Sequence, residues 1–114
     1  FGHALQGLKV LFSSQKNAFI HFFLMLVSVV FGVLLDISSI EWVLIIICSG
    51  MVMAAEAFNT ALEKMADTLH PEKNDGIGSA KDLAAGSVLI TAIAALVIGI
   101  IIFAPKLHIW IKSI

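Results

Sequence analysis

Residues 40–67 read IEWVLIIICSGMVMAAEAFNTALEKMAD, an apolar run that passes without a break into a row of polar side chains. The apolar part, Ile40–Ala57, approaches the ~20 residues that a helix needs to cross a membrane. Neither proline nor glycine occurs between Met51 and Asp67. The sequence therefore predicts a helix that spans a membrane over residues 40–57 and continues outside it to about residue 68.

Two other runs have the same character, Ala18–Leu35 and Leu83–Ala104. Of the 114 residues, 60% are hydrophobic and only 13% are charged, whereas a soluble domain of this length needs more polar surface to cover its core. We expect one membrane-embedded, all-α domain over residues 1–114 with three transmembrane helices.

The connections between these spans are polar. Asp36–Ser39 is a short turn, and Lys64–Lys81 contains Pro71 and Gly76, which are expected to break any helix and to form a loop or hinge. Lysines are unequally divided between the two sides, with Lys9, Lys16, Lys64, Lys73 and Lys81 on one and Lys106 and Lys112 on the other. The positive-inside rule then predicts that the N-terminus and the Lys64–Lys81 loop are cytoplasmic.

The N-terminal segment Gly2–Ser14 has Leu5, Leu8, Leu11 and Phe12 on one face, with polar side chains opposite. This pattern predicts an amphipathic helix lying on the membrane surface, the alternative being an arm packed on a partner. Phe1 opens the sequence without a signal-peptide pattern, and we expect a short N-terminal piece to precede it.

Several function classes are excluded. Net charge is −1 and arginine is absent, so nothing indicates nucleic-acid binding. The single Cys48 cannot form an intrachain disulfide and is expected to be a small buried hydrophobe. No glycine-rich phosphate loop, CxxC pair or nucleophile elbow occurs, which excludes the familiar soluble kinase folds.

Four polar residues of the opening stretch form a stripe. Glu56, Asn59, Glu63 and Asp67 are spaced by three, four and four residues, which aligns them on one helix face. Ionised groups at membrane depth are costly and face a bundle interior or a wet cavity, and stacked carboxylates require a counter-ion. Mg²⁺ fits, because it takes one or two carboxylates and completes its shell with water and phosphate oxygens. A solvated helix extension is the alternative for Asp67.

Other polar residues near the membrane boundaries have two interpretations each. Lys81 could reach phosphate oxygens, with Asp82 holding it or capping the third helix, or the pair could be a snorkelling lysine and a capping acid. His21 is expected to lie at the level of the lipid headgroups and to form a hydrogen bond with a neighbour. The alternative is that His21 takes part in the chemistry of the site. Trp42 fits an interfacial anchor on the outer side.

On these residues the sequence resembles the prokaryotic diacylglycerol kinase family, which includes undecaprenol kinases. The matching features are Gly7-Leu8, the Glu56–Asp67 signature, Pro71-Glu72 and Ala80-Lys81-Asp82. The resemblance implies a homotrimer of three-span subunits with an N-terminal surface helix and active sites between subunits. It also implies a bacterial cytoplasmic membrane protein.

The resemblance further implies roles for individual residues. Glu56 would be the catalytic base, and Glu63 a magnesium ligand with Asn59 beside it. The ATP site would comprise His3, Gln15, Glu63, Glu72, Lys73, Asn74, Lys81 and Asp82. The lipid site would comprise Glu56, Asn17, His21, Trp42 and Ala85.

The sequence departs from the family pattern at some positions. Gln15 stands where a second metal-binding glutamate is common, which puts metal affinity in question, because an amide oxygen carries no charge. His3 stands where a tyrosine is frequent, and Ser79 and Ala85 replace more polar residues. Asn17 with His21 favours the undecaprenol kinase branch.

The predicted function is ATP-dependent phosphorylation of a membrane lipid alcohol, either diacylglycerol or undecaprenol. One alternative is a degenerate, lipid-binding subunit. Another is a cation conductor, which would require polar groups along the span before Glu56, yet Val43–Ala55 offers only Cys48 and Ser49.

Overall fold

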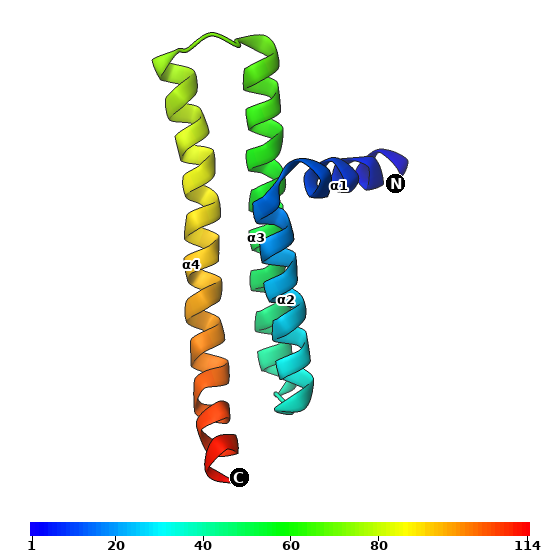
Figure 1. Cartoon of the computed structure of the whole chain (residues 1–114), viewed down its shortest axis with the longest axis vertical. Coiled ribbons are helices and arrows are strands. Elements are labelled where there is room, and N and C mark those ends of the chain that lie inside the picture. The colour runs from blue at the N-terminus through cyan, green and yellow to red at the C-terminus, as the bar shows by residue number, and fades with distance from the viewer.

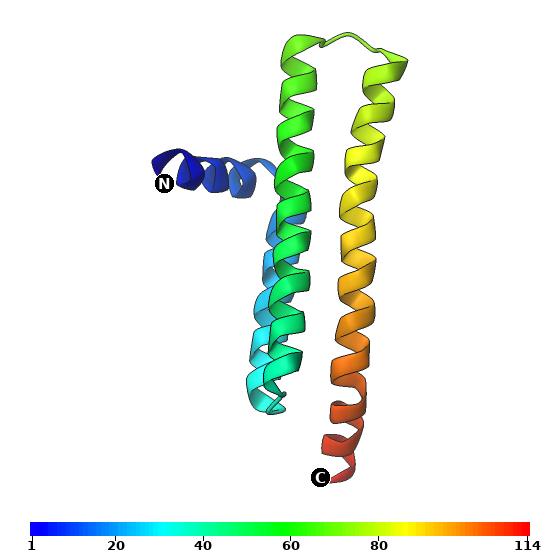
Figure 2. The same ribbon diagram turned by 180° about the vertical axis from the view of Figure 1, so that it is seen from behind.

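The computed structural model describes every residue, Phe1–Ile114, and contains four helices: α1 (Gly2–Ser14), α2 (Lys16–Leu34), α3 (Ser39–Leu69) and α4 (Asp75–Lys112). α3 and α4 form a long antiparallel hairpin, α2 runs beside part of α3, and α1 lies crosswise (Figures 1 and 2). Three of the helices, α2, α3 and α4, are long and apolar enough to cross a membrane. The expected all-helical class, with three apolar helices and a short N-terminal one, is confirmed.

Side-chain caps define where α3 and α4 begin. The Ser38 hydroxyl accepts a hydrogen bond from the Glu41 backbone N–H at 3.2 Å, and the Glu41 carboxylate accepts one from the Ser38 N–H at 2.9 Å. The Asn74 side chain accepts from the Ile77 N–H at 3.1 Å. Each cap satisfies backbone donors that have no partner within their helix, and thereby fixes the start of the helix.

The connection between α3 and α4 is shorter than the sequence predicted. It comprises residues 70–74, so Lys81 lies in a helix rather than in a loop, and Lys64 lies in the helical extension of α3, which ends at Leu69. The expectation that Gly76 breaks a helix is wrong, because Gly76 lies in the first turn of α4. Backbone N–H groups of a first turn have no intrahelical acceptor, so the Asn74 cap is sufficient to start the helix there.

The best-packed region lies at the end of the bundle away from α1. Ile37, Ile45 and Ile102 are buried together, with Trp42 and Phe103 packed against them. A side chain at Gly32 would bring its Cβ to 2.6 Å from the Trp42 ring, so this close approach requires glycine. Only 11 of 114 residues are buried, and most apolar side chains therefore face outward, where lipid or further copies of the chain can cover them.

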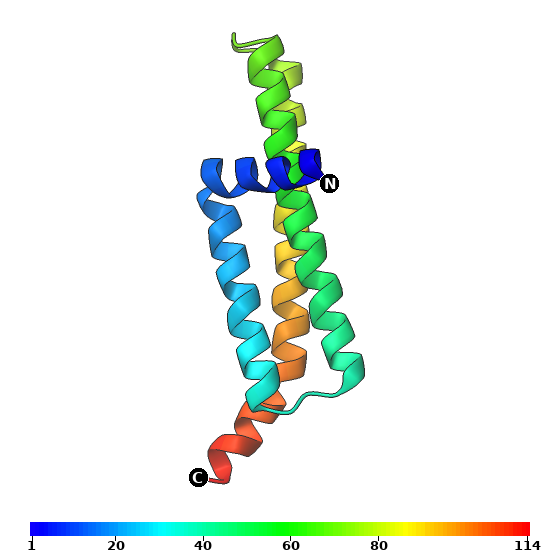
Figure 3. The same ribbon diagram turned by 90° about the vertical axis from the view of Figure 1, so that its right-hand side faces the viewer.

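The corner between α1 and α2 positions the candidate site. The Phe12 ring packs edge-on against Phe19 and Phe22, with centroids 5.5 and 5.4 Å apart. Gln15 is extended between the two helices, and α1 consequently lies across α3 (Figure 3). This geometry brings the corner against the polar stripe of α3.

Candidate active site

The polar stripe of α3 runs from the interior of the bundle to its surface. Glu56 is 2% exposed and Asn59 8%, Glu63 is half-buried, and Asp67 is exposed. No break in α3 separates these residues, so they share one face, as their spacing predicts. Each buried member needs a polar partner, because an unpaired charge away from water is costly.

Glu56 finds its partner on α2. His21 Nε2 lies 3.4 Å from Glu56 Oε1, and no lysine nitrogen lies within 4.0 Å of this carboxylate. The Thr60 hydroxyl donates to the Glu56 backbone carbonyl at 2.8 Å and so leaves the carboxylate free. Glu56 is therefore a buried carboxylate whose one nearby nitrogen partner is an imidazole.

About two turns further along α3, three residues meet around Glu63. Gln15 Nε2 lies 3.5 Å from Glu63 Oε2, and Asn59 Nδ2 donates to Glu63 Oε1 at 3.4 Å. The other amide atom of Asn59, Oδ1, is buried and has no hydrogen-bond partner. The structure therefore brings together Gln15, Asn59 and Glu63, the three residues predicted to bind metal.

These donors fit Mg²⁺ bound together with a substrate. Glu63 supplies a charged oxygen, and the unpartnered Asn59 Oδ1 supplies a neutral one. Gln15 supplies a second neutral oxygen if its amide group rotates so that Oε1 replaces Nε2. No group of three or more His, Cys, Asp or Glu side chains forms a metal cage of its own. Mg²⁺ suits such a sparse set, because it keeps waters and takes further ligands from phosphates.

The exposed end of the stripe is paired with α4. Lys81 Nζ forms an ion pair with Asp67 Oδ1, so the partner of Lys81 is on α3 and is not its neighbour Asp82. The expectation that Asp82 caps the third helix is wrong, because the cap is Asn74. Asp82 lies exposed about 100° further around α4.

The predicted nucleotide residues of the loop lie beyond this ion pair. Glu72, Lys73 and Asn74 are exposed between α3 and α4, and Asn74 is also the helix cap. The Glu72 carboxylate lies 3.0 Å from His70 Nδ1, without the geometry of a hydrogen bond. These three loop residues are near Asp67 and Lys81 in sequence but form no hydrogen bond or ion pair with Glu56 or Glu63.

Four further predicted residues are separate from the stripe. His3 is exposed on α1, Asn17 is exposed in the first turn of α2, and Ala85 is exposed on α4. Trp42 packs over Gly32, fourteen residues before Glu56 on α3, which corresponds to about 21 Å of helix. The structure does not bring Trp42 to the site.

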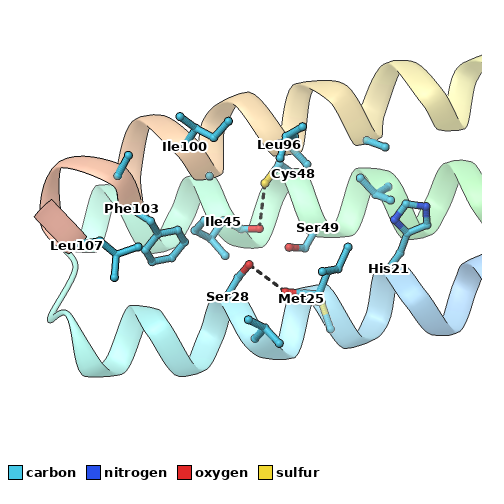
Figure 4. Close-up of a pocket in the computed structure, with 17 residues that line it drawn as sticks. His21, Met25, Ser28, Ile45, Cys48, Ser49, Leu96, Ile100, Phe103 and Leu107 are labelled. Atoms are coloured by element: carbon cyan, nitrogen blue, oxygen red, sulfur yellow. Dashed lines mark hydrogen bonds between the residues drawn. The ribbon is translucent and has the colours of Figure 1, made fainter. Parts of the chain in front are cut away.

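A cavity of about 530 Å³ lies between α2, α3 and α4. Thirteen of its 17 lining residues are hydrophobic. Two of its polar groups are satisfied locally, since the Ser28 hydroxyl donates to Leu24 O at 3.0 Å and the Cys48 thiol to Ile45 O at 3.4 Å. His21 lies at one end and Leu107 at the other (Figure 4). The cavity is therefore apolar along its length and ends beside the partner of Glu56.

Two pairings were not predicted from the sequence, His21–Glu56 and Asp67–Lys81. The second could have been found, because Asp67 and Lys81 are equally far from Asn74, and residues equidistant from a hairpin turn lie opposite one another. The first depends on how α2 and α3 pack, and the only sequence signal for it was a histidine within an apolar run.

Comparisons with known proteins show which sequences the chain is similar to. Residues 2–103 match the family model described as prokaryotic diacylglycerol kinase. An undecaprenol kinase from Bacillus subtilis is 33% identical over 107 residues, covering 94% of this chain and 87% of the relative. A diacylglycerol kinase from Synechocystis is 35% identical over 108 residues, covering 94% and 62%. A diacylglycerol kinase from Haemophilus influenzae is 36% identical over 100 residues, covering 87% and 81%.

Proposed function

The chain belongs to the prokaryotic diacylglycerol kinase family, and from that premise we propose that this bacterial membrane lipid kinase uses Glu56 as its catalytic base. The observation that carries the proposal is the near-complete burial of this carboxylate next to an apolar cavity. A buried carboxylate without a lysine partner is costly to keep for structure alone. A cation conductor is not favoured, because the polar groups of the cavity are few and some are locally satisfied.

The lipid alcohol binds with its hydroxyl at Glu56 and its chain in apolar surroundings. Glu56 accepts the hydroxyl proton while the lipid oxygen attacks the γ-phosphorus of ATP, and the bond from that phosphorus to the bridging oxygen of ADP breaks. General-base help of this kind contributes about 10²–10⁴-fold to the rate. The membrane confines the substrate to two dimensions, so a chain of 114 residues needs no deep pocket for the whole lipid.

Glu63, Asn59 and Gln15 hold magnesium with the phosphates of ATP. When bound, the ion offsets negative charge on the phosphates. Gln15 contributes a neutral oxygen in place of a carboxylate, so the ion is held with one negative charge fewer than a second glutamate would supply. The carboxylate of Glu63 is the charged anchor of this set.

The nucleotide extends from Glu63 of one subunit toward the exposed end of the α3–α4 hairpin of a neighbouring subunit. Lys81 binds phosphate oxygens there, with Asp82 and the loop residues Glu72, Lys73 and Asn74 around the rest of ATP. His3 on α1 is assigned to the same ATP site. Five lysines lie on the membrane side of the N-terminus and the α3–α4 connection, and two lie on the other side. This distribution supports an inner-membrane protein whose N-terminus and α3–α4 connection face the cytoplasm.

The functional unit is a homotrimer with shared sites. Supporting this, the chain buries little of its own apolar surface, and Lys81 pairs with Asp67, eleven residues or about 17 Å of helix beyond Glu56. A lysine that meets the γ-phosphate at Glu56 is therefore more easily supplied by a neighbouring copy.

The lipid is identified by transfer of labelled phosphate from ATP to a panel of lipid alcohols in mixed micelles. Asn17 and His21 lead us to expect faster transfer to undecaprenol than to diacylglycerol. Faster transfer to diacylglycerol would assign the chain to the other branch, and failure to label any lipid alcohol would refute the proposed function.

A further inference from the structure

Glu56 is held by one side chain of another helix. Glu56 is 2% exposed, and His21 Nε2 lies 3.4 Å from its Oε1. No other ionisable side chain has a nitrogen within 4.0 Å of this carboxylate. The other buried polar groups nearby belong to α3 itself: Asn59 donates to Glu63, and Thr60 to a backbone carbonyl. His21 is thus the contact from α2 that can fix how the carboxylate points.

We propose that His21 is a positioning residue for the kinase reaction: its Nε2–H donates to Glu56 Oε1 and turns Oε2 toward the lipid hydroxyl. The inference rests on the proposed role of Glu56 as the base. The two atoms are 3.4 Å apart without the geometry of a hydrogen bond in this structure, and catalytic contacts that are poorly aligned in the absence of substrate commonly tighten when it binds.

The location of His21 supports this assignment. His21 is 21% exposed and contributes to the wall of the apolar cavity at its end (Figure 4). A lipid chain lying in this cavity brings its polar end to the imidazole, and the buried Glu56 lies next to it. The imidazole therefore contacts both the end of the apolar cavity and the carboxylate, where it can orient the base toward the lipid hydroxyl.

A positioning role makes a different kinetic prediction from a simple lipid contact. Loss of the donor leaves Glu56 present but free to rotate, and misorientation of this kind costs about ten- to a hundredfold in kcat. KM for ATP should stay unchanged. A residue that only touched the lipid would instead raise KM for the lipid and leave kcat unaltered.

The test compares His21→Phe, which removes the donor, with His21→Gln, which keeps an N–H donor, in the full chain in mixed micelles. The expected result is a fall in kcat for His21→Phe and recovery of most of it in His21→Gln. His108→Phe is the matched control, because His108 is exposed near the far end of α4 and should keep wild-type rates. Adding His21→Phe to Glu56→Gln should cause no further loss.

Full kcat in His21→Phe, with Glu56→Gln inactive, would overturn this inference and leave the proposed base standing. Full activity in Glu56→Gln would overturn both. A second measurement detects the proton itself: ¹⁵N NMR of histidine-labelled wild-type protein, with His21 assigned by comparison to His21→Gln. A proton on Nε2 is expected, and an Nε2 without a proton would refute the donation to Glu56.

Discussion

Gln15 and Glu63 meet where the chain turns from α1 into α2. Because the Gln15 side chain is a neutral amide, the affinity of this corner for a cation depends mainly on the charge of Glu63. The 3.5 Å contact between Gln15 Nε2 and Glu63 Oε2 needs no metal, because an amide donor satisfies a carboxylate. A second carboxylate there would repel Glu63 until a cation joined them.

Changing Gln15→Glu should therefore strengthen the dependence on magnesium. We expect the magnesium concentration for half-maximal activity to fall by roughly tenfold, about 1.4 kcal/mol of binding free energy. Thermal stability in detergent should also rise more steeply with added magnesium than in the wild type.

The control is Gln6→Glu, which adds the same charge at an exposed position of α1. If both variants respond to magnesium alike, the effect is one of surface charge, and Gln15 is not a metal ligand.

Gly32 is a second residue whose chemistry can be tested directly. A Cβ at this position would lie 2.6 Å from the Trp42 ring, so Gly32→Ala should destabilise the fold by about 1–3 kcal/mol through overpacking. Thermal unfolding in detergent measures this, with Gly50→Ala as the control, because a Cβ there meets nothing within 4 Å. Trp42→Leu should restore most of the stability lost in Gly32→Ala, and failure to do so would show that the clash is not the cause.

Among the elements, the α3–α4 hairpin differs most from what the sequence predicted. Hydrophobic runs predicted three helices because run length and apolarity are local properties. Helix ends depend on single caps, and the Asn74 cap starts α4 at Asp75, so Gly76 lies inside the helix and does not break it as predicted. The stripe on α3 was predictable from its spacing, whereas the partners of Glu56 and Asp67 lie on other helices, and helical periodicity contains no information on which helices pack together.

The same hairpin holds Lys81 at its exposed end, and Lys81→Met tests whether the nucleotide binds there. Removing a charged hydrogen bond to phosphate costs about 1.5–3 kcal/mol, so KM for ATP should rise by roughly ten- to a hundredfold, with a smaller change in KM for the lipid. Lys64→Met is the control, because Lys64 is exposed on α3 and is assigned no role. A larger rise in KM for the lipid than for ATP would relocate Lys81 to the lipid headgroup.

For the whole molecule, the small buried core and the spacing of the site residues along α3 both lead us to expect that several copies of the chain assemble. A chain with 11 buried residues of 114 leaves large apolar faces to be covered. Its Lys81 also lies about 17 Å of helix away from its own Glu56. Assembly of several copies accounts for both features, because a neighbour can cover apolar faces and supply a lysine.

Shared sites predict complementation between two inactive variants. Glu56→Gln and Lys81→Met subunits, unfolded and refolded together, should form mixed trimers that regain part of the activity, measured as phosphate transfer to lipid. Each variant refolded alone is the control. Mixed trimers that form but stay inactive would mean that both residues act from one chain or that each site tolerates no defect. An active monomer in detergent would refute the shared site.

The central claim is that this membrane protein is a lipid kinase with Glu56 as its base, and Glu56→Gln tests it most directly. The substitution is nearly isosteric and removes only the capacity to accept the proton. Phosphate transfer from labelled ATP to lipid in mixed micelles should fall at least about a hundredfold, while oligomeric state and thermal stability remain those of the wild type. Transfer at a near-normal rate by a folded Glu56→Gln protein would contradict the claim.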